Sequence, residues 1–293
     1  MTKILITGKT GQVGWELQRA LAPLGQIVAL DRREMDLADP DSIRAALRAC
    51  DPQIIVNAAA YTAVDQAESE PALALAINGV APGIMAEIAK KTGALLVHYS
   101  TDYVFDGAKS GPYAENDTPA PINVYGSSKL AGERAVAASG ARHLIFRTSW
   151  VYGARGKNFL RTMLRLAQER DELRIVDDQT GAPTWCRAIA QATAQVLASD
   201  HADASGTYHL SAAGNTSWCG FARAILECAG HTCRVVPIPT SAYPLPARRP
   251  ANSVLSNARL NARFGVTLAN WHESLRGCHS AMTNDASLAR DQG

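Results

Sequence analysis

The sequence contains neither a C-x-x-C pair nor an H-E-x-x-H pattern, and its six cysteines and seven histidines are scattered over 293 residues. Zinc sites need clustered thiolates and imidazoles, so no metal site is predicted. Cysteines without a framework of pairs favour reduced thiols and a cytoplasmic protein. His98 lies inside an apolar stretch and is expected to be a hydrogen-bonded core residue.

An excess of charge of one sign is also lacking. The 29 basic and 27 acidic residues give a formal net charge of +2 without a basic tract. This argues against nucleic acid as a partner but not against a small anionic ligand. The apolar runs are short and interrupted by charge, so no membrane partner is predicted. The chain enters a strand directly after Met1, without a signal peptide, and it has no internal repeat.

Apolar strands alternate with helical stretches in the first half of the chain. The predicted strands are residues 3–7, 26–30, 53–57, 94–100 and 143–147, and the predicted helices are 12–24, one from residue 40, 71–91, and one from Tyr125 to near Gly140. Near-continuous apolar strands that alternate with helices indicate a parallel sheet covered on both faces. The predicted fold class is therefore α/β, a Rossmann-like doubly wound parallel sheet.

A G-x-x-G-x-x-G pattern at residues 8–14 stands between the first strand and the first helix. Glycines there let the backbone approach a pyrophosphate, whose charge then meets the amides of the helix N-terminus. Asp31 ends the second strand and suits the ribose 2′-hydroxyl of NADH. Arg32 and Arg33 follow at once, and guanidinium groups suit the 2′-phosphate of NADPH. These residues leave both cofactors open.

Tyr125 and Lys129 are four residues apart, on one face of a predicted helix. A phenol there can protonate a carbonyl oxygen, and an ammonium beside it favours the phenolate and lowers the pKa of the phenol. Thr101 ends the fourth strand at the same edge of the sheet and is a candidate to donate a hydrogen bond to that carbonyl, with Ser100 as the alternative. The order of glycine turn, Thr101, Tyr125 and Lys129 favours a reductase site over an unrelated surface helix.

Longer strings carry a resemblance to a known family. They are the glycine turn and the stretches 60–65, 100–105, 147–153, 178–184 and 249–253. From residue 3 to about residue 275 the chain resembles the dTDP-4-dehydrorhamnose reductase family of the extended short-chain dehydrogenase/reductase superfamily. That resemblance implies hydride transfer from NADPH or NADH to C4 of dTDP-4-dehydro-L-rhamnose, which gives dTDP-L-rhamnose.

The resemblance also implies roles at the matching positions. Tyr125 would be the general acid, Lys129 its electrostatic partner and a ribose contact, and Thr101 a hydrogen-bond donor to the substrate carbonyl. Residues expected around the nucleotide cofactor are Gly8, Gly11, Gln12, Val13, Gly14, Asp31, Asp36, Leu37, Ala59, Ala60 and Thr62. Those expected to face the sugar are Val64, Asp65, Asp102, Tyr103 and Trp150.

The second half of the sequence is expected to build the substrate site. A dinucleotide-binding domain is predicted for residues 1–150 and mainly a sugar-nucleotide-binding domain for 151–280, followed by a loose tail at 281–293. Within 151–280, helices are predicted at 158–170 and 187–197, and the segment near 173–199 is a candidate to return to the first domain. Arg248 and Arg249, in a proline-rich loop, are either diphosphate ligands or a solvated pair.

Alternatives to a catalytic reductase stay open at this stage. One is a non-catalytic NADP-binding regulatory subunit, and another is a related nucleotide-sugar reductase or epimerase. A dehydratase would need an Asp-Glu pair after the Thr101 position, and Tyr103 stands where that glutamate is required.

The same resemblance bears on assembly. Some members of the family are dimers in which glutamates hold Mg²⁺ at the interface. Here Arg187 occupies the expected glutamate position, and the C-terminal stretch 272–279 offers only Glu273. A hard cation needs carboxylate ligands, so no interfacial metal is predicted, and a monomer is favoured over a metal-free dimer.

Overall fold

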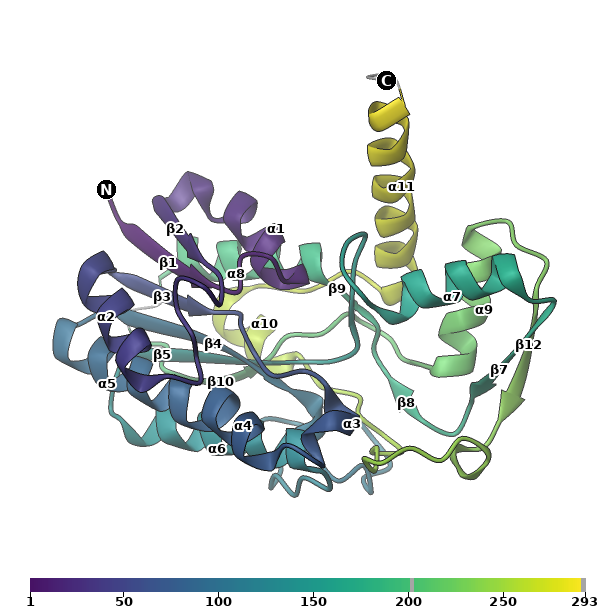
Figure 1. Ribbon diagram of the computed structural model, residues 1–293, viewed down its shortest axis with the longest axis horizontal. Coiled ribbons are helices and arrows are strands. Elements are labelled where there is room, and N and C mark those ends of the chain that lie inside the picture. Colours follow the sequence, from purple (N-terminus) through teal and green to yellow (C-terminus); the bar gives the residue numbers. More distant parts are fainter. Residues whose placement is uncertain (201–202, 291–293) are drawn as a thin grey trace.

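A parallel sheet of six strands forms the centre of the larger part of the molecule (Figure 1). The computed structural model describes residues 1–200 and 203–290. The strand order is β10-β5-β4-β3-β1-β2, with β1 (Lys3–Thr7), β2 (Gln26–Leu30), β3 (Ile54–Asn57), β4 (Leu95–Thr101), β5 (His143–Thr148) and β10 (Gly206–His209). The order reverses between β1 and β3, and a ligand crevice is expected at the carboxyl ends of those strands.

Helices cover both faces of the sheet, which confirms the predicted fold class. The helices on one face are α1 (Gln12–Ala20), α8 (Cys186–Ala198) and α10 (Ala258–Phe264), and those on the other are α2 (Pro40–Cys50), α5 (Ala81–Thr92) and α6 (Val124–Ala138). Alternate residues of β1 supply both cores: Ile4 and Ile6 pack on one side and Leu5 on the other. The two cores together fix the sheet that carries the site. We call this part the sheet unit.

Two long predicted helices are interrupted. The stretch 12–24 is α1 followed by a 3₁₀ turn, Ala22–Leu24, because Pro23 cannot continue the helical hydrogen bonds. The stretch 71–91 consists of α4 (Pro71–Leu75), a π-helical turn (Ala76–Val80) and α5. By length and composition alone, Pro71–Thr92 could cross a membrane, which contradicts the prediction that the apolar runs are too short for this. Half of its most apolar window is buried inside the fold, where α5 packs against α2 and α6.

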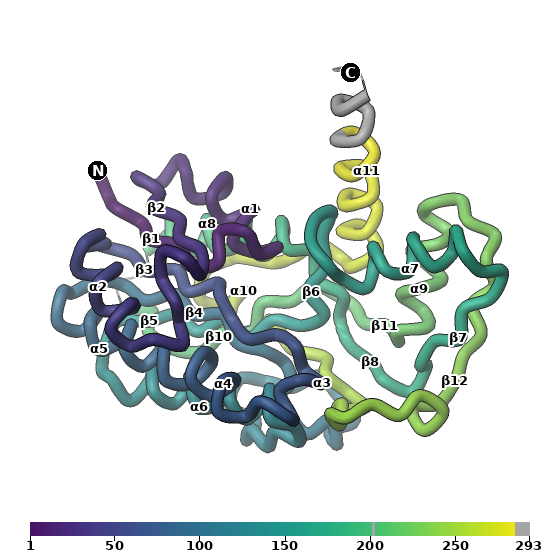
Figure 2. The backbone as a smooth tube through the Cα atoms, in the orientation of Figure 1, coloured from purple at the N-terminus to yellow at the C-terminus, as the bar shows by residue number. Residues whose placement is uncertain are grey.

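A small unit of helices and short strands lies beside the sheet unit, on the right of Figures 1 and 2. It is built from α7 (Phe159–Glu169), β7 (Glu172–Val176), α9 (Trp218–Cys228), β12 (Arg234–Ile238) and the start of α11 (Trp271–Arg290). Strand β7 pairs in parallel with β12, and Phe221, Leu160 and Trp271 lie in the core between the helices. Two short pairs complete it: β6 (Val151–Tyr152) with β9 (Thr184–Trp185), and β8 (Thr180–Gly181) with β11 (Thr216–Ser217).

The chain returns to the sheet unit after β9. Helix α8 packs against α1 through residues such as Ile189, and β10 then adds to the sheet beside β5. The returning segment therefore starts at α8, whereas the earlier part of the predicted stretch 173–199 holds β7, which pairs with β12.

Residues 281–290, expected to be a loose tail, are helical. They continue α11 (Figure 1). The start of this helix is anchored on the small unit by the buried side chains of Trp271, Leu275 and Cys278. Residues 291–293 lie outside the described residues.

Candidate active site

The glycine turn brings bare backbone to the carboxyl end of β1. Gly8 has φ +72°, and a Cβ on Gly14 would lie 2.1 Å from the carbonyl oxygen of Gly8, so α1 reaches the turn only without side chains there. Gly11 caps α1 without a side-chain hydrogen bond to the first-turn amides. A concave backbone at a helix N-terminus fits a dinucleotide pyrophosphate. Gln12 accepts a hydrogen bond from Asn158 Nδ2 at 2.9 Å and so ties this turn to the start of α7.

The other predicted cofactor residues line the same edge but differ in exposure. Ala59 and Ala60 are partly exposed after β3, and Thr62 is exposed beyond them. Leu37 is 7% exposed and belongs to the core beneath this edge, and Val13 packs against the opposite core. The edge therefore presents mostly backbone and small side chains to a flat ligand.

The second strand ends in a cluster of charges. Lys9 Nζ donates to Glu34 and lies 3.7 Å from Asp31, whose backbone amide donates to Glu34 as well. Arg32 is 76% exposed and lies 3.6 Å from Asp36. The cation closest to Asp31 in this cluster is thus Lys9, from the glycine turn, rather than either arginine that follows Asp31.

Helix α6 places Tyr125 against the turn that follows β4. Asn123 caps the helix by accepting from the Gly126 amide at 2.7 Å. A Cβ on Gly126 would lie 2.1 Å from the carbonyl oxygen of Tyr103, so only glycine allows this approach. As a result the rings of Tyr125 and Tyr103 meet edge to face, with centroids 5.9 Å apart.

The predicted lowering of the Tyr125 pKa by Lys129 is wrong for this arrangement. Burial raises the pKa of Tyr125 to about 12, the Thr101 hydroxyl acts in the opposite direction, and the Asp102 charge raises it further. The Lys129 ammonium instead donates to the carbonyl oxygen of Tyr99 at 2.6 Å, and burial lowers the pKa of Lys129 to about 8. A phenol that keeps its proton at neutral pH is suited to give that proton away in a reduction.

The Thr101 hydroxyl is engaged within the site. It donates to Asp102 Oδ1 at 3.0 Å and accepts from the Tyr103 amide at 3.1 Å. Ser149 donates to the other oxygen of Asp102 at 3.1 Å. Burial raises the pKa of Asp102 to about 6, although hydrogen bonds from Ser253, Thr101 and Ser149 lower it. A ligand carbonyl would have to compete with Asp102 for the proton of Thr101.

Two of the predicted substrate residues, Asp65 and Arg249, pair with each other. Asp65, on α3 (Val64–Ala67), accepts two hydrogen bonds from Arg249, at 3.0 and 2.6 Å. Arg249 is therefore neither a solvated cation nor free for a diphosphate in this arrangement. Neighbouring Arg248 is exposed, and its backbone carbonyl accepts from Asn123 at 2.8 Å.

Trp150 is held in a strained conformation between the units. Its φ of 46° lies in the left-handed region, which is rare for a bulky residue. Its indole stacks on Trp218 with centroids 3.6 Å apart, and a Cβ on Gly181 would lie 2.3 Å from that indole. Sequence reasoning found Trp150 but not Trp218, because nothing local links two residues so far apart in the chain.

Asn78 was also missed by sequence reasoning. It lies in the π-helical turn between α4 and α5, a local irregularity that often marks a functional position. Its amide bonds both the N–H and the carbonyl of Tyr61, at 2.9 and 3.0 Å, and the Ser128 hydroxyl at 3.0 Å. It thereby fixes the loop after β3 to α6. The one available signal was an asparagine inside an alanine-rich helix.

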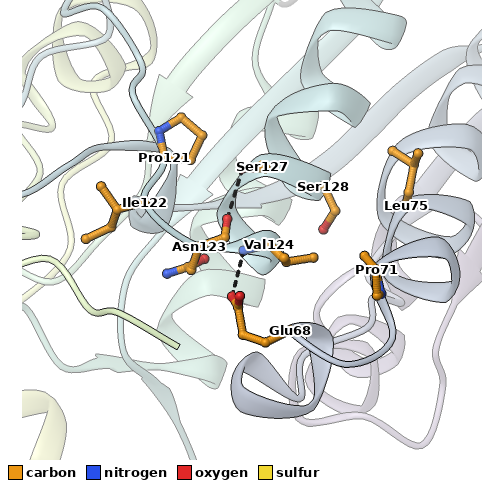
Figure 3. Close-up of a pocket in the computed structure, with 9 residues that line it drawn as sticks. All are labelled: Glu68, Pro71, Leu75, Pro121, Ile122, Asn123, Val124, Ser127 and Ser128. Carbon is orange, nitrogen blue, oxygen red and sulfur yellow. Dashed lines mark hydrogen bonds between the residues drawn. The ribbon is translucent and has the colours of Figure 1, made fainter. Parts of the chain in front are cut away.

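A cavity of about 510 Å³ opens beside the N-terminus of α6, where Glu68 accepts from the Val124 amide at 2.9 Å (Figure 3). It is lined by Glu68, Pro71, Leu75, Pro121, Ile122, Asn123, Val124, Ser127 and Ser128. None of the predicted catalytic, cofactor or sugar residues lines it, so the site rests on the sheet edge rather than on this cavity. Within the described residues, no cluster of three or more His, Cys, Asp or Glu side chains could hold a metal ion.

The parallel sheet, the glycine turn and a Tyr-x-x-x-Lys pair on α6 define a nucleotide-dependent oxidoreductase of the short-chain dehydrogenase/reductase type. Comparison with known proteins narrows the class. Residues 1–284 match the family model described as the RmlD substrate binding domain. The chain is 56% identical to a dTDP-4-dehydrorhamnose reductase of Burkholderia thailandensis, over 94% of this chain and 97% of the relative, and 47% identical to that of Escherichia coli K12, over 93% and 95%.

A solved structure agrees with the sequence relatives. The dTDP-4-dehydrorhamnose reductase of Bacillus anthracis, in complex with NADP, superposes with a TM-score of 0.91 at 37% identity, covering 96% of this chain and all of that one. The chain belongs to the dTDP-4-dehydrorhamnose reductase family.

Proposed function

We infer that the protein reduces the C4 keto group of dTDP-4-dehydro-L-rhamnose with NADPH or NADH and releases dTDP-L-rhamnose. The observation that carries this inference is Thr101, Tyr125 and Lys129 at one sheet edge, in a chain 56% identical to a reductase of that name. The sheet unit would bind the cofactor, and the small unit would close over the dTDP-sugar. A cytoplasmic location accords with cysteines that are free throughout the described residues.

The nicotinamide supplies the hydride, and this chain supplies binding and proton transfer. The backbone of the glycine turn would hold the pyrophosphate, and Asp31 would meet the adenosine ribose. Tyr125 donates its proton to the oxygen at C4 as negative charge develops there. Thr101 and Lys129 orient the groups around that oxygen.

Particular residues favour catalysis over the alternatives. A subunit that only binds NADP would not need a buried phenol with a raised pKa, and Tyr125 has one. Tyr103 in place of glutamate disfavours a dehydratase, because it cannot serve as the second carboxylate. A reductase of another nucleotide sugar differs from this proposal only in its substrate, whereas a related epimerase would give no net oxidation of the nicotinamide.

A coupled assay tests the function directly. Purified protein, NADPH and dTDP-glucose that has been processed by the upstream dehydratase and epimerase should give a loss of nicotinamide absorbance and one equivalent of dTDP-L-rhamnose. Omission of the epimerase is the control and should abolish the signal. Tight NADPH binding without turnover would instead favour the regulatory subunit.

Cofactor choice should depend on the charges around Asp31. Asp31 suits NADH and the nearby cations suit NADPH, so we expect both cofactors to be used with modest discrimination. Replacing Arg32 and Arg33 together by alanine should weaken the binding of NADPH about 10- to 150-fold and spare that of NADH, because a charged hydrogen bond to phosphate contributes about 1.5–3 kcal/mol.

Fluorescence titration of the reduced nicotinamides measures both affinities. Lys9→Met is the matched variant: it removes the cation nearest Asp31 and leaves the two arginines in place. Equal losses for NADH and NADPH in the double arginine variant would show that Arg32 and Arg33 do not read the 2′-phosphate.

We expect a monomer that does not depend on a metal. Arg187 donates to Glu16 at 3.1 Å and stacks over Trp185, so a fixed cation stands at the position where magnesium-linked relatives need a carboxylate. Light scattering in the presence and absence of EDTA should give the same mass, that of one chain. A dimer that dissociates on chelation would contradict both parts of this expectation. A dimer unaffected by EDTA would contradict only the expected monomer, not the independence from metal.

A further inference from the structure

A row of buried polar side chains crosses the sheet from β1 to α6. Thr7, Asn57 and His98 are register partners on β1, β3 and β4, and each is at most 1% exposed. Thr7 Oγ1 lies 2.7 Å from Asn57 Oδ1, and Asn57 Nδ2 lies 3.1 Å from His98 Nδ1. At the far end, His98 Nε2 lies 3.5 Å from Lys129 Nζ. This confirms His98 as a hydrogen-bonded core residue and connects it to the lysine of the site.

The first member of the row fixes its direction. The backbone N–H of Ala59, which can only donate, bonds Thr7 Oγ1 at 3.1 Å. The Thr7 hydroxyl then donates to Asn57 Oδ1, and this turns the Asn57 amide nitrogen toward His98. Burial lowers the pKa of His98 and keeps the ring neutral, with a single N–H. Because Nδ1 accepts from Asn57, that hydrogen lies on Nε2 and points at Lys129.

The charges around Lys129 make this direction matter. Lys129 is 2% exposed and donates to the Tyr99 carbonyl oxygen. Glu133, one turn further along α6, favours the ammonium, but its carboxylate is held by two hydrogen bonds from Arg147. On the strand side, the group that faces Nζ is His98.

One turn before Lys129 on α6, Tyr125 lies near Asp102, whose charge raises the pKa of the phenol. An N–H aimed at Nζ disfavours the ammonium and offers a hydrogen bond to the neutral amine.

We propose that His98 is a positioning residue whose Nε2–H tautomer, set by Thr7 and Asn57, holds Lys129 and stabilises its neutral amine. The importance of Lys129 itself rests on the function proposed above. Each reduction consumes one proton: the O–H bond of Tyr125 breaks and an O–H bond forms at C4. A proton must then return to the Tyr125 phenolate: an N–H bond of the Lys129 ammonium breaks and the O–H bond of Tyr125 re-forms. A stabilised neutral amine favours this transfer, and the amine then regains a proton from water.

The tautomer can be observed without turnover. Long-range ¹H–¹⁵N NMR of the imidazole rings separates a protonated ring nitrogen from an unprotonated one, and the signals of His98 are identified by their loss in His98→Gln. We expect a hydrogen on Nε2 and none on Nδ1 at neutral pH. A hydrogen on Nδ1, or a charged ring, would overturn the proposal whether or not the protein is a reductase.

A single isosteric substitution should exchange the donor and acceptor roles of the two ring nitrogens of His98. Asn57→Asp places a carboxylate, which can only accept, against His98 Nδ1, so Nε2 becomes an acceptor for the Lys129 ammonium. We expect the alkaline limb of the kcat–pH profile to move up by about one pH unit or more. His98→Gln should keep the wild-type limb, since a glutamine amide can accept from Asn57 and donate to Lys129.

The control is His143→Gln, a buried histidine at the start of β5 whose Nδ1 lies 2.9 Å from the Ala141 carbonyl oxygen; its profile should not move. An unchanged alkaline limb in folded Asn57→Asp would refute the proposal. If that variant does not fold, the NMR measurement of the His98 tautomer in the wild-type protein decides whether the proposal holds. Wild-type turnover in Lys129→Met would remove Lys129 from the mechanism and overturn its proposed role. No turnover by the wild-type protein in the coupled assay would sink the proposed function instead and leave the tautomer result standing.

Discussion

Replacing Tyr125 by phenylalanine is expected to slow the reduction by about 10²–10⁴-fold, the range for loss of a positioned general acid. The substitution removes one hydroxyl and keeps the ring. The edge-to-face contact of that ring with Tyr103 does not depend on the hydroxyl. Burial raises the pKa of Tyr125 to about 12, so the wild-type residue carries its proton at neutral pH and the variant has none to give. Cofactor affinity should stay close to that of the wild type.

The rate is measured as nicotinamide absorbance under saturating substrate, and the cofactor affinity by fluorescence titration. Tyr208→Phe is the matched control, because its buried hydroxyl bonds only the Ala204 carbonyl oxygen among the described contacts and lies on β10, at the edge of the sheet. It should lose about 0.5–1.5 kcal/mol of stability and no activity. Turnover of Tyr125→Phe near the wild-type rate would remove Tyr125 from the mechanism.

The largest expected loss of stability is at the buried ion pair between β5 and α6. Arg147 donates to both carboxylate oxygens of Glu133, at 2.9 and 2.7 Å, and the two side chains are 5% and 6% exposed. Its guanidinium also lies over the Phe105 ring. Arg147→Met leaves the Glu133 carboxylate buried without its cation, and the free energy of unfolding should fall by about 3–5 kcal/mol.

Urea unfolding at unchanged m-value measures that loss. Adding Glu133→Leu to Arg147→Met should recover most of it, because well-packed apolar residues can replace a buried ion pair at little cost. The surface control is Arg165→Met, which breaks the exposed pair with Glu169 and should change stability by about 1 kcal/mol or less. A loss below about 1 kcal/mol in Arg147→Met would mean that the buried charge finds water or another partner.

Most of the sheet could be predicted from the sequence, because its strands are local apolar runs. The exception is β10, four residues containing Gly206 and His209, which has no apolar alternation and pairs only because β5 offers a free edge. The β7–β12 pairing was equally hidden, since the two strands are separated by α8, β10 and α9. A pattern of neighbours in the chain carries no information on such long-range pairing.

The candidate site likewise has parts that could be predicted from the sequence and parts that could not. Tyr125 and Lys129 were predictable because helical spacing alone puts them on one face. The Asp65–Arg249 pair and the Trp150–Trp218 stack were not, because each joins residues that lie far apart in the chain. Lys9 beside Asp31 depends on how β1 and β2 pair.

The sequence by itself determined which chemistry this protein carries: a glycine turn after a strand, a hydroxyl at a strand end, and a phenol and an amine one helical turn apart. Only the tertiary structure decided how those groups are tuned. Burial holds the pKa of Tyr125 high, and the carbonyl oxygen of Tyr99, rather than the phenol of Tyr125, accepts the hydrogen bond from Lys129. The physical reason is that residue type and spacing are local properties, whereas desolvation and hydrogen-bond partners depend on every element that packs around a group.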